Sequence, residues 1–286
     1  MRKFSIVLLS VLLLIVFVGC DLSVATMGKM GKNLAGTDKN YVASIIKQTE
    51  PEAAKKKDED GKITITGSNF SISASEGKGS ISIGGKDVKV PSELQTAINK
   101  VLTDSEFSSI ILPTDISDIV LGVKSGSNSE IIKEELKKTA KDDSLKAAQG
   151  TVTLVNAMLD EVQKAVKDDD PEGGFDEVIK DIKGFLPDKG SITNGDVVVL
   201  TALTNIIFNE NVLSNVGSIM EKPESPSDKD AQEKYDSAMK EVTGEMMNQF
   251  SSLLDVVTNV PSGMSNKIND FINDLMDSSD NKEKAE

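Results

Sequence analysis

Residues 62–90 read KITITGSNFSISASEGKGSISIGGKDVKV, and this stretch decides the fold of the chain. Apolar and polar side chains alternate in four short runs, which Gly-containing segments separate. Alternation with a period of two places the apolar side chains of a strand on one face, and short Gly-rich connections are typical of β-hairpins. We therefore predict a four-stranded antiparallel β-meander with one apolar face and one face rich in Ser and Thr. The apolar positions of the four runs are Ile63 and Ile65, Phe70 and Ile72, Ile81 and Ile83, and Val88 and Val90.

A sheet with one apolar face needs other elements to cover that face. After Pro91 the apolar residues recur at spacings of three and four, which indicates amphipathic helices. Ser92 and Gln95 have the spacing of a capping box at the start of the first helix. Further helices are expected at about 131–140, 145–166, 175–186, 197–220 (after a helix start at 191–196), 239–257 and 264–276, with a Pro-containing linker at 221–230.

These patterns predict an α+β fold that is predominantly helical. A small four-stranded antiparallel β-meander near the N-terminus, at about 62–90, is covered by amphipathic helices at about 92–277. A single domain is expected over residues 39–277. The charged run at 50–62 is interpreted as a solvated linker, and residues 278–286 as a disordered acidic tail.

The chain opens with two positive residues, Arg2 and Lys3, and an uncharged apolar run follows up to Val18. This run is shorter than the roughly 20 residues that span a bilayer as a helix, so residues 1–19 are interpreted as a signal peptide. The run ends in Phe17-Val18-Gly19-Cys20, which resembles the lipobox of bacterial lipoproteins. The resemblance implies cleavage before Cys20 and a diacylglycerol thioether on its sulfur. Lipoboxes usually have Leu at the place of Phe17, and lipoboxes that depart from the usual residues in this way are familiar from spirochaetes.

A lipid on Cys20 would anchor the protein to a membrane of the cell envelope, either in a periplasmic leaflet or at the cell surface. Residues 20–38 would then form a flexible tether. The alternative is an ordinary secreted protein that is cut nearby. Cys20 is the only cysteine, however, so it has no partner for an intramolecular disulfide, and a free thiol is unusual in an exported protein. The cysteine count therefore favours lipidation.

Composition narrows the classes of function. The chain contains no histidine, which excludes Ser-His-Asp triads, Cys-His nucleophilic sites and imidazole zinc sites. A net charge of −14 and the absence of tryptophan disfavour a nucleic-acid partner, because such partners need basic surfaces and stacking side chains. We therefore expect no catalytic site, no cofactor and no bound metal.

Two acidic segments could supply oxygen ligands to a cation. With Gly61 at position six of a calcium loop, Lys56 and Gly67 would occupy positions that need carboxylates. In residues 168–174 the carboxylates are mixed with Pro and Gly and have no ordered ligand spacing. Both segments are interpreted as solvated turns.

Residues 197–220 contain one charged residue, Glu210, but carry too many Thr, Asn and Ser residues for a membrane span. The favoured interpretation is a buried central helix, or a pair of helices, whose hydroxyls and amides find partners within the body. The alternative is an interfacial helix that can leave the core for lipid.

Methionine placement is the one candidate binding signal. Six of the ten methionines lie between Met220 and Met276, on helices that also carry phenylalanine. Methionine suits adaptable apolar binding surfaces. The candidate contacts for an apolar ligand or a membrane are Met246, Phe250, Leu254, Met264, Phe271 and Met276. The alternative is that these stripes pack in the core, and the lack of a basic polar face on the same helices favours that alternative.

The sequence thus predicts a lipid-anchored cell-envelope protein with a non-enzymatic binding role. Its expected partners are a membrane, through the lipid on Cys20, and a lipid or an envelope or host protein. The alternative is a surface-exposed adhesin or another partner-binding lipoprotein. An enzyme that uses carboxylates or lysine is a third class, which the missing histidine disfavours.

Overall fold

The computed structural model describes the main body of the chain and not its N-terminal segment. The described residues are 55–67, 70–88, 90, 92–112, 117–124, 129–166, 174–207 and 253–283, together with residues 233, 237 and 240. The predicted signal peptide, Cys20, the tether and the linker at 221–230 lie outside them, as do most of the predicted helix at 239–257 and the acidic turn at 168–173.

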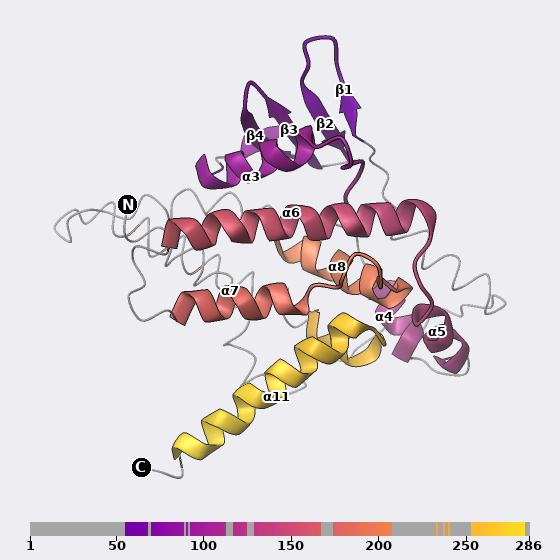
Figure 1. Ribbon diagram of the computed structural model, residues 1–286. Coiled ribbons are helices and arrows are strands. Elements are labelled where there is room, and N and C mark those ends of the chain that lie inside the picture. The colour runs from indigo at the N-terminus through magenta and orange to yellow at the C-terminus, as the bar shows by residue number, and fades with distance from the viewer. Residues whose placement is uncertain are drawn as a thin grey trace.

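The sheet has five antiparallel strands, and their spatial order is their order in the sequence (Figure 1). The strands are β1 (Lys56–Lys57), β2 (Ile63–Thr66), β3 (Phe70–Ser75), β4 (Lys78–Ile83) and β5 (Lys86–Val88). The α+β class is confirmed, and a strand lies at each of the four predicted runs, although β5 ends at Val88 and does not include Val90. The predicted number of four strands was wrong, because the sheet has five. The additional strand, β1, lies in the charged run that was interpreted as a linker. Two lysines show no alternation, and a short, charged strand is a common way to end a sheet at its edge.

The pairing register places the apolar side chains of the strands on one face. Ile65 pairs with Ile72, and Ile72 pairs with Ile81, and all three are at most 1% exposed. On the opposite face Ser73 pairs with Ser80, and their Oγ atoms are 2.8 Å apart. The register therefore keeps the alternation that the sequence predicted.

Helix α3 (Ser92–Thr103) covers the apolar face of the sheet. It buries Leu94, Ile98, Val101 and Leu102 against the strands and the next layer. The predicted capping-box residue Gln95 instead donates from Nε2 to the carbonyl oxygen of Val90, at 2.7 Å. This bond fixes the chain between β5 and α3.

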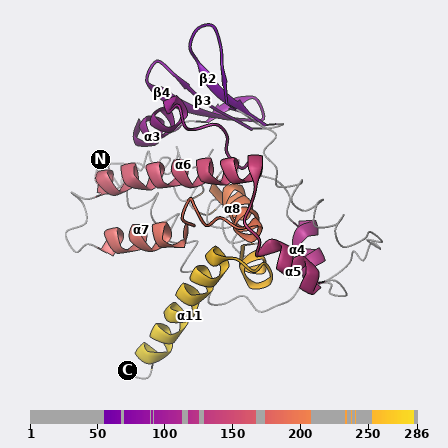
Figure 2. The same cartoon turned by 45° about the vertical axis from the view of Figure 1, so that its right-hand side comes forward.

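The remaining described helices form successive layers below α3 (Figures 1 and 2). They are α4 (Ser117–Lys124), α5 (Ser129–Leu136), α6 (Asp142–Val166), α7 (Gly174–Phe185), α8 (Asn194–Ile207) and α11 (Gly263–Glu283), with a further helical segment at 253–259. Helix α6 packs on α3, α7 and α8 lie beneath α6, and α11 contacts α7 and α8. The sheet and the C-terminal end of α11 therefore lie at opposite ends of the molecule.

One continuous core runs through these layers. Buried apolar residues from Ile63 in the sheet to Ile268 in α11 belong to a single cluster. Helix α8 lies at its centre: Val197, Val198, Val199 and Leu200 are each at most 2% exposed. The buried hydroxyl of Thr201 donates to the carbonyl oxygen of Val197. For the described part of 197–220, the buried-helix interpretation is therefore confirmed.

Helix α11 continues to Glu283, so it includes residues 278–283 of the segment that was expected to be a disordered tail. No Pro or Gly follows Gly263 before its end, so nothing in the sequence breaks the helix. Within the described part of the chain, no helix has the length and apolar character to cross a bilayer.

Candidate functional site

Helix α11 carries most of the described residues that were predicted to contact an apolar ligand or a membrane. Met264, Phe271 and Met276 belong to α11, and Leu254 lies in the helical segment before it. The side chain of Met276, and the whole of Met246 and Phe250, lie outside the described residues. The structure therefore places three of the six predicted side chains.

The apolar stripe of α11 becomes more exposed along the helix. Met264 is 1% exposed and Ile268 is 9% exposed, so the beginning of the stripe lies in the core. One turn further, Phe271 and Ile272 are only half-buried. Leu254 is also half-buried and packs on the core. In this arrangement the accessible part of the stripe begins at Phe271.

Two contacts join the middle of α11 to the end of α7. The ring of Phe271 meets the ring of Phe185 edge to face, with centroids 5.1 Å apart and planes at 66°. This is a favoured geometry for aromatic pairs. Lys267 donates from Nζ to the carbonyl oxygen of Leu186, at 3.3 Å. These contacts fix the direction in which α11 leaves the body.

The N-terminus of α11 has a side-chain cap. Ser262 Oγ accepts a hydrogen bond from the amide of Ser265, at 2.9 Å, and Ser265 Oγ donates to the carbonyl oxygen of Val260, at 2.7 Å. Ser at this position satisfies one of the four amides that a helix start leaves without a partner. The amide of Met264 needs a different acceptor.

That acceptor is Asp196, which belongs to the first turn of α8. Its Oδ1 accepts from the amide of Met264 at 3.0 Å, across 68 residues of sequence. Its Oδ2 accepts from the amide and the hydroxyl of Thr193, at 2.9 and 2.8 Å, and Thr193 Oγ1 accepts from the amide of Asp196 in return. One carboxylate therefore serves the N-termini of two helices, which both favour negative charge.

A third helix ends at the same junction. Asn194, the first residue of α8, donates from its amide to the carbonyl oxygen of Lys138 at 2.8 Å, and from Nδ2 to that of Glu135 at 3.0 Å. These carbonyls belong to the C-terminal end of α5 and the turn after it. The start of α8 thus connects α5 to α11.

This junction explains why Asp196 can be buried. It is 2% exposed, and it is the one charged side chain in the described core. A buried charge is tolerated where it is fully hydrogen-bonded, and Asp196 accepts three bonds. Because its oxygens are occupied by backbone and hydroxyl donors, we assign it a structural role.

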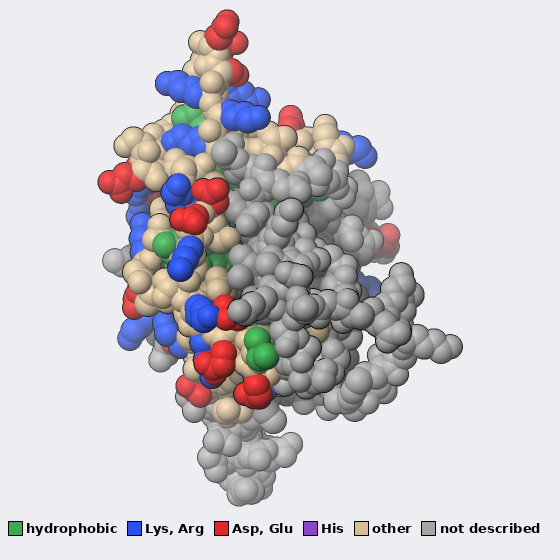
Figure 3. Space-filling model, turned by 90° about the vertical axis from the view of Figure 1, so that its right-hand side faces the viewer, with side chains coloured by type: hydrophobic (Ala, Val, Ile, Leu, Met, Phe, Trp, Pro, Cys, Tyr) green, Lys and Arg blue, Asp and Glu red, His purple; other side chains and the backbone are tan. Residues whose placement is uncertain are grey.

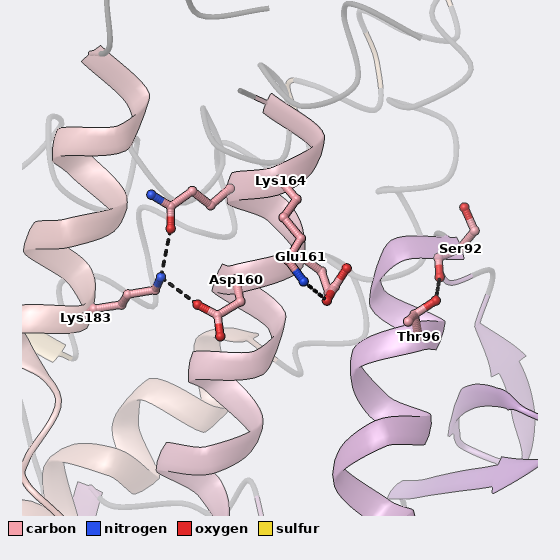
Figure 4. Close-up of polar contacts among 7 residues, drawn as sticks. Ser92, Thr96, Asp160, Glu161, Lys164 and Lys183 are labelled. Atoms are coloured by element: carbon pink, nitrogen blue, oxygen red, sulfur yellow. Dashed lines mark hydrogen bonds and ion pairs between the residues drawn. The ribbon is translucent and has the colours of Figure 1, made fainter. Parts of the chain in front are cut away.

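Metal-binding side chains do not gather anywhere in the described residues. These residues contain no group of three or more acidic or other ligand-type side chains able to hold a metal ion. Lys183 of α7 contacts Asp160 and Gln163 of α6, with Nζ at 2.8 and 2.9 Å from their oxygens (Figure 4). Asp160 is 54% exposed, so these three side chains form a surface contact between two helices and not an enclosed site.

The described surface mixes charges of both signs. On the described part of the face shown in Figure 3, Lys side chains lie among Asp and Glu, and hydrophobic side chains form small separate spots. Most of the ion pairs connect residues one helical turn apart. At the C-terminal end of α5, a hydrogen bond from Lys137 to Glu134 lowers the pKa of the Glu134 carboxyl and raises the pKa of Lys137 itself. Such pairs are typical of a solvated surface.

No protein-family model, characterised protein or solved structure matches this chain. The residues and contacts described above therefore carry the functional argument. Of the residues that organise the candidate site, sequence reasoning marked 191–196 only as a helix start. The spacing of Thr193 and Asp196 is a local signal for a cap, but the bond from Asp196 to Met264 depends on tertiary structure.

Proposed function

We propose that the protein is a lipid-anchored component of the cell envelope that acts by binding and not by catalysis. In this proposal the lipid on Cys20 holds the body at a bilayer, and α11 contacts the acyl chains of that bilayer. The observation that carries the proposal is the partial exposure of Phe271 and Ile272, whereas Met264 and Ile268 earlier in the same stripe are buried.

The shape of the molecule supports this orientation. The outer end of α11 extends away from the other labelled helices in both ribbon views (Figures 1 and 2). In sequence, the stripe continues beyond Ile272 with Leu275 and Met276 at helical spacing. An amphipathic helix at the edge of a body can place its apolar side in the boundary region of a leaflet.

The charges of α11 specify which bilayer surface it suits. Asp270, Asp274 and Asp277 follow one another at spacings of three and four, and no Lys or Arg lies between Lys267 and Lys282. Anionic headgroups would repel this sequence. We therefore expect α11 to bind neutral bilayers better than anionic ones.

Liposome flotation of the mature chain with Cys20→Ser, which removes the acyl anchor, tests the proposal. We expect this protein to float with phosphatidylcholine vesicles, and Phe271→Ser to reduce the floating fraction several-fold because it removes an aromatic side chain from the contact. Ile131→Ser is the matched control, since Ile131 is 47% exposed on α5, away from α11.

If the unanchored chain stays at the bottom with neutral and anionic vesicles alike, α11 does not bind lipid. The result would then favour the alternative, a surface-exposed adhesin or partner-binding lipoprotein held at the membrane by Cys20 alone. Equal losses of flotation from Phe271→Ser and Ile131→Ser would also contradict a site on α11.

A further inference from the structure

We propose that α11 is a hinged strap, latched to the start of α8 by Asp196, whose release exposes Met264 and Ile268 to the bilayer. The proposal rests on the proposed membrane contact, and it concerns the regulation of that same surface. It explains why the stripe that ends at the half-buried Phe271 and Ile272 begins with side chains that are buried in the resting body.

The hinge is the turn of Val260, Pro261 and Ser262 between the helical segment 253–259 and α11. Its position is fixed by Gly195 of α8, where an added Cβ would lie 2.2 Å from the carbonyl oxygen of Pro261. The absence of a side chain at Gly195 thus lets the hinge lie directly on the start of α8. A rotation of α11 at the hinge must also open the bonds from Ser265 to Ser262 and Val260.

The latch is the bond between Asp196 Oδ1 and the amide of Met264. When this bond opens, Oδ2 keeps its two bonds from Thr193, so α8 retains its cap. The released Oδ1 and the released amide would both face the space that α11 vacates, where water can bind them. Opening therefore leaves no buried charge without a partner, which is the usual obstacle to breaking such a contact.

The docking of α11 is light compared with that of α6. Among the described residues, α11 buries Met264, Ser265 and Ile268, and Ile272 packs on the core. Further contacts join Ser265 to Val260, Lys267 to Leu186, Asn269 to Val257, and Phe271 to Phe185. By contrast, the buried residues of α6 extend over about four turns: Ser144, Ala147, Ala148, Thr151, Val152, Leu154, Val155 and Leu159. Elements with few buried contacts open before the global unfolding of a protein.

Native-state hydrogen exchange on the mature chain with Cys20→Ser tests the strap. We expect the amides of residues 266–272 to exchange at least about tenfold faster than those of 152–159 in α6, through an opening whose urea dependence is smaller than that of global unfolding. If both sets exchange through one common, urea-dependent opening, α11 does not move separately and the proposal is overturned.

Two variants then test the latch. Asp196→Asn keeps the shape of the side chain but turns an amide NH2 toward one of its two donors, Met264 or Thr193. We expect the exchange of 266–272 to rise by a further factor of about ten. Thr193→Val is the matched control, because it removes the reciprocal cap of α8 and leaves the bond to Met264 in place. Equal acceleration of α11 in both variants would overturn the latch.

Flotation of Asp196→Asn separates this inference from the proposed function. Faster exchange in α11 together with greater binding to phosphatidylcholine vesicles supports both. Faster exchange with unchanged flotation supports the latch and overturns the membrane contact. Greater flotation without faster exchange in α11 overturns the latch, since the exposed surface would then lie elsewhere.

Discussion

At position 79, the lack of a side chain sets the distance between the sheet and α3. A Cβ on Gly79 would lie 2.3 Å from Cβ of Ile98 and 2.7 Å from the carbonyl oxygen of Gln95. Real side-chain atoms do not approach so closely, so any larger residue must push α3 away from β4. Ile98 is fully buried, and its packing on the strand depends on that gap.

We therefore expect Gly79→Ala to destabilise the protein by about 1–3 kcal/mol, the usual cost of overpacking. Gly184→Ala is the matched control: position 184 lies in α7 with nothing within 4 Å of an added Cβ. There the same change should stabilise the helix by about 0.5–1 kcal/mol. Urea unfolding measures both, and effects of equal sign would contradict the close-contact argument.

Residue-level prediction from the sequence succeeded for the buried isoleucines and failed for this glycine. Alternation alone places Ile65, Ile72 and Ile81 on one face, because the strand period is two. From the sequence, Gly79 belongs to one of the Gly-containing segments between the alternating runs, which were predicted to be hairpin connections. In the structure only Glu76 and Gly77 form that turn, with φ of 51° and 80°, and Gly79 lies within β4. A close tertiary approach leaves no local signal that distinguishes it from a turn.

At the level of elements, burial and not polar contact holds the helices together. Ile179 of α7 is 0% exposed, whereas the ion pair from Lys183 to Asp160, on the same pair of helices, is open to water. We expect Ile179→Ala to cost about 2–5 kcal/mol through lost burial and a cavity. Lys183→Met should cost less than about 1 kcal/mol, because exposed ion pairs contribute little.

Thermal and urea unfolding of the two variants distinguish the contribution of apolar burial from that of the ion pair. A loss for Lys183→Met as large as that for Ile179→Ala would mean that the contacts in Figure 4 fix the position of α7. High salt provides a second check, since it should weaken the ion pair and leave the burial of Ile179 unaffected.

The presence of the helices could be predicted because their apolar residues recur periodically over several turns. The predicted stripe of α6 is buried at Val152, Val155 and Leu159, and the expected helix at 145–166 begins three residues earlier, at Asp142. The junction of α5, α8 and α11 was not predictable. Its bonds join backbone groups to Asn194 and Asp196, and backbone groups carry no sequence signature.

At the scale of the whole molecule, one core connects the sheet with the helical layers. We therefore expect the sheet, α3 and α6 to unfold in a single transition, apart from the earlier opening of α11. Circular dichroism at 222 nm and hydrogen exchange of β3 and β4 should report the same urea midpoint. A sheet that persists after the helices melt would show that two independent units exist.

The α+β class followed from the sequence because strand and helix periods occupy separate parts of the chain. The order of the layers did not follow. Several helices carry apolar stripes of similar strength, and any of them could have covered the sheet. In the structure α3 covers the sheet, and Ile98 of α3 lies directly against Gly79 of β4. The fifth strand, β1, was not predicted because it consists of two lysines, which show no alternation of apolar and polar residues.

The order of the strands bears on how the chain could fold as it is made. Each strand pairs with its immediate neighbour in sequence, so a polypeptide that emerges N-terminus first can complete the meander one hairpin at a time. Short-range contacts of this kind form quickly. The bond between Asp196 and Met264, by contrast, must wait until nearly the whole chain has appeared. The sheet end would thus take shape during synthesis, and the contact between α8 and α11 would be the last to form.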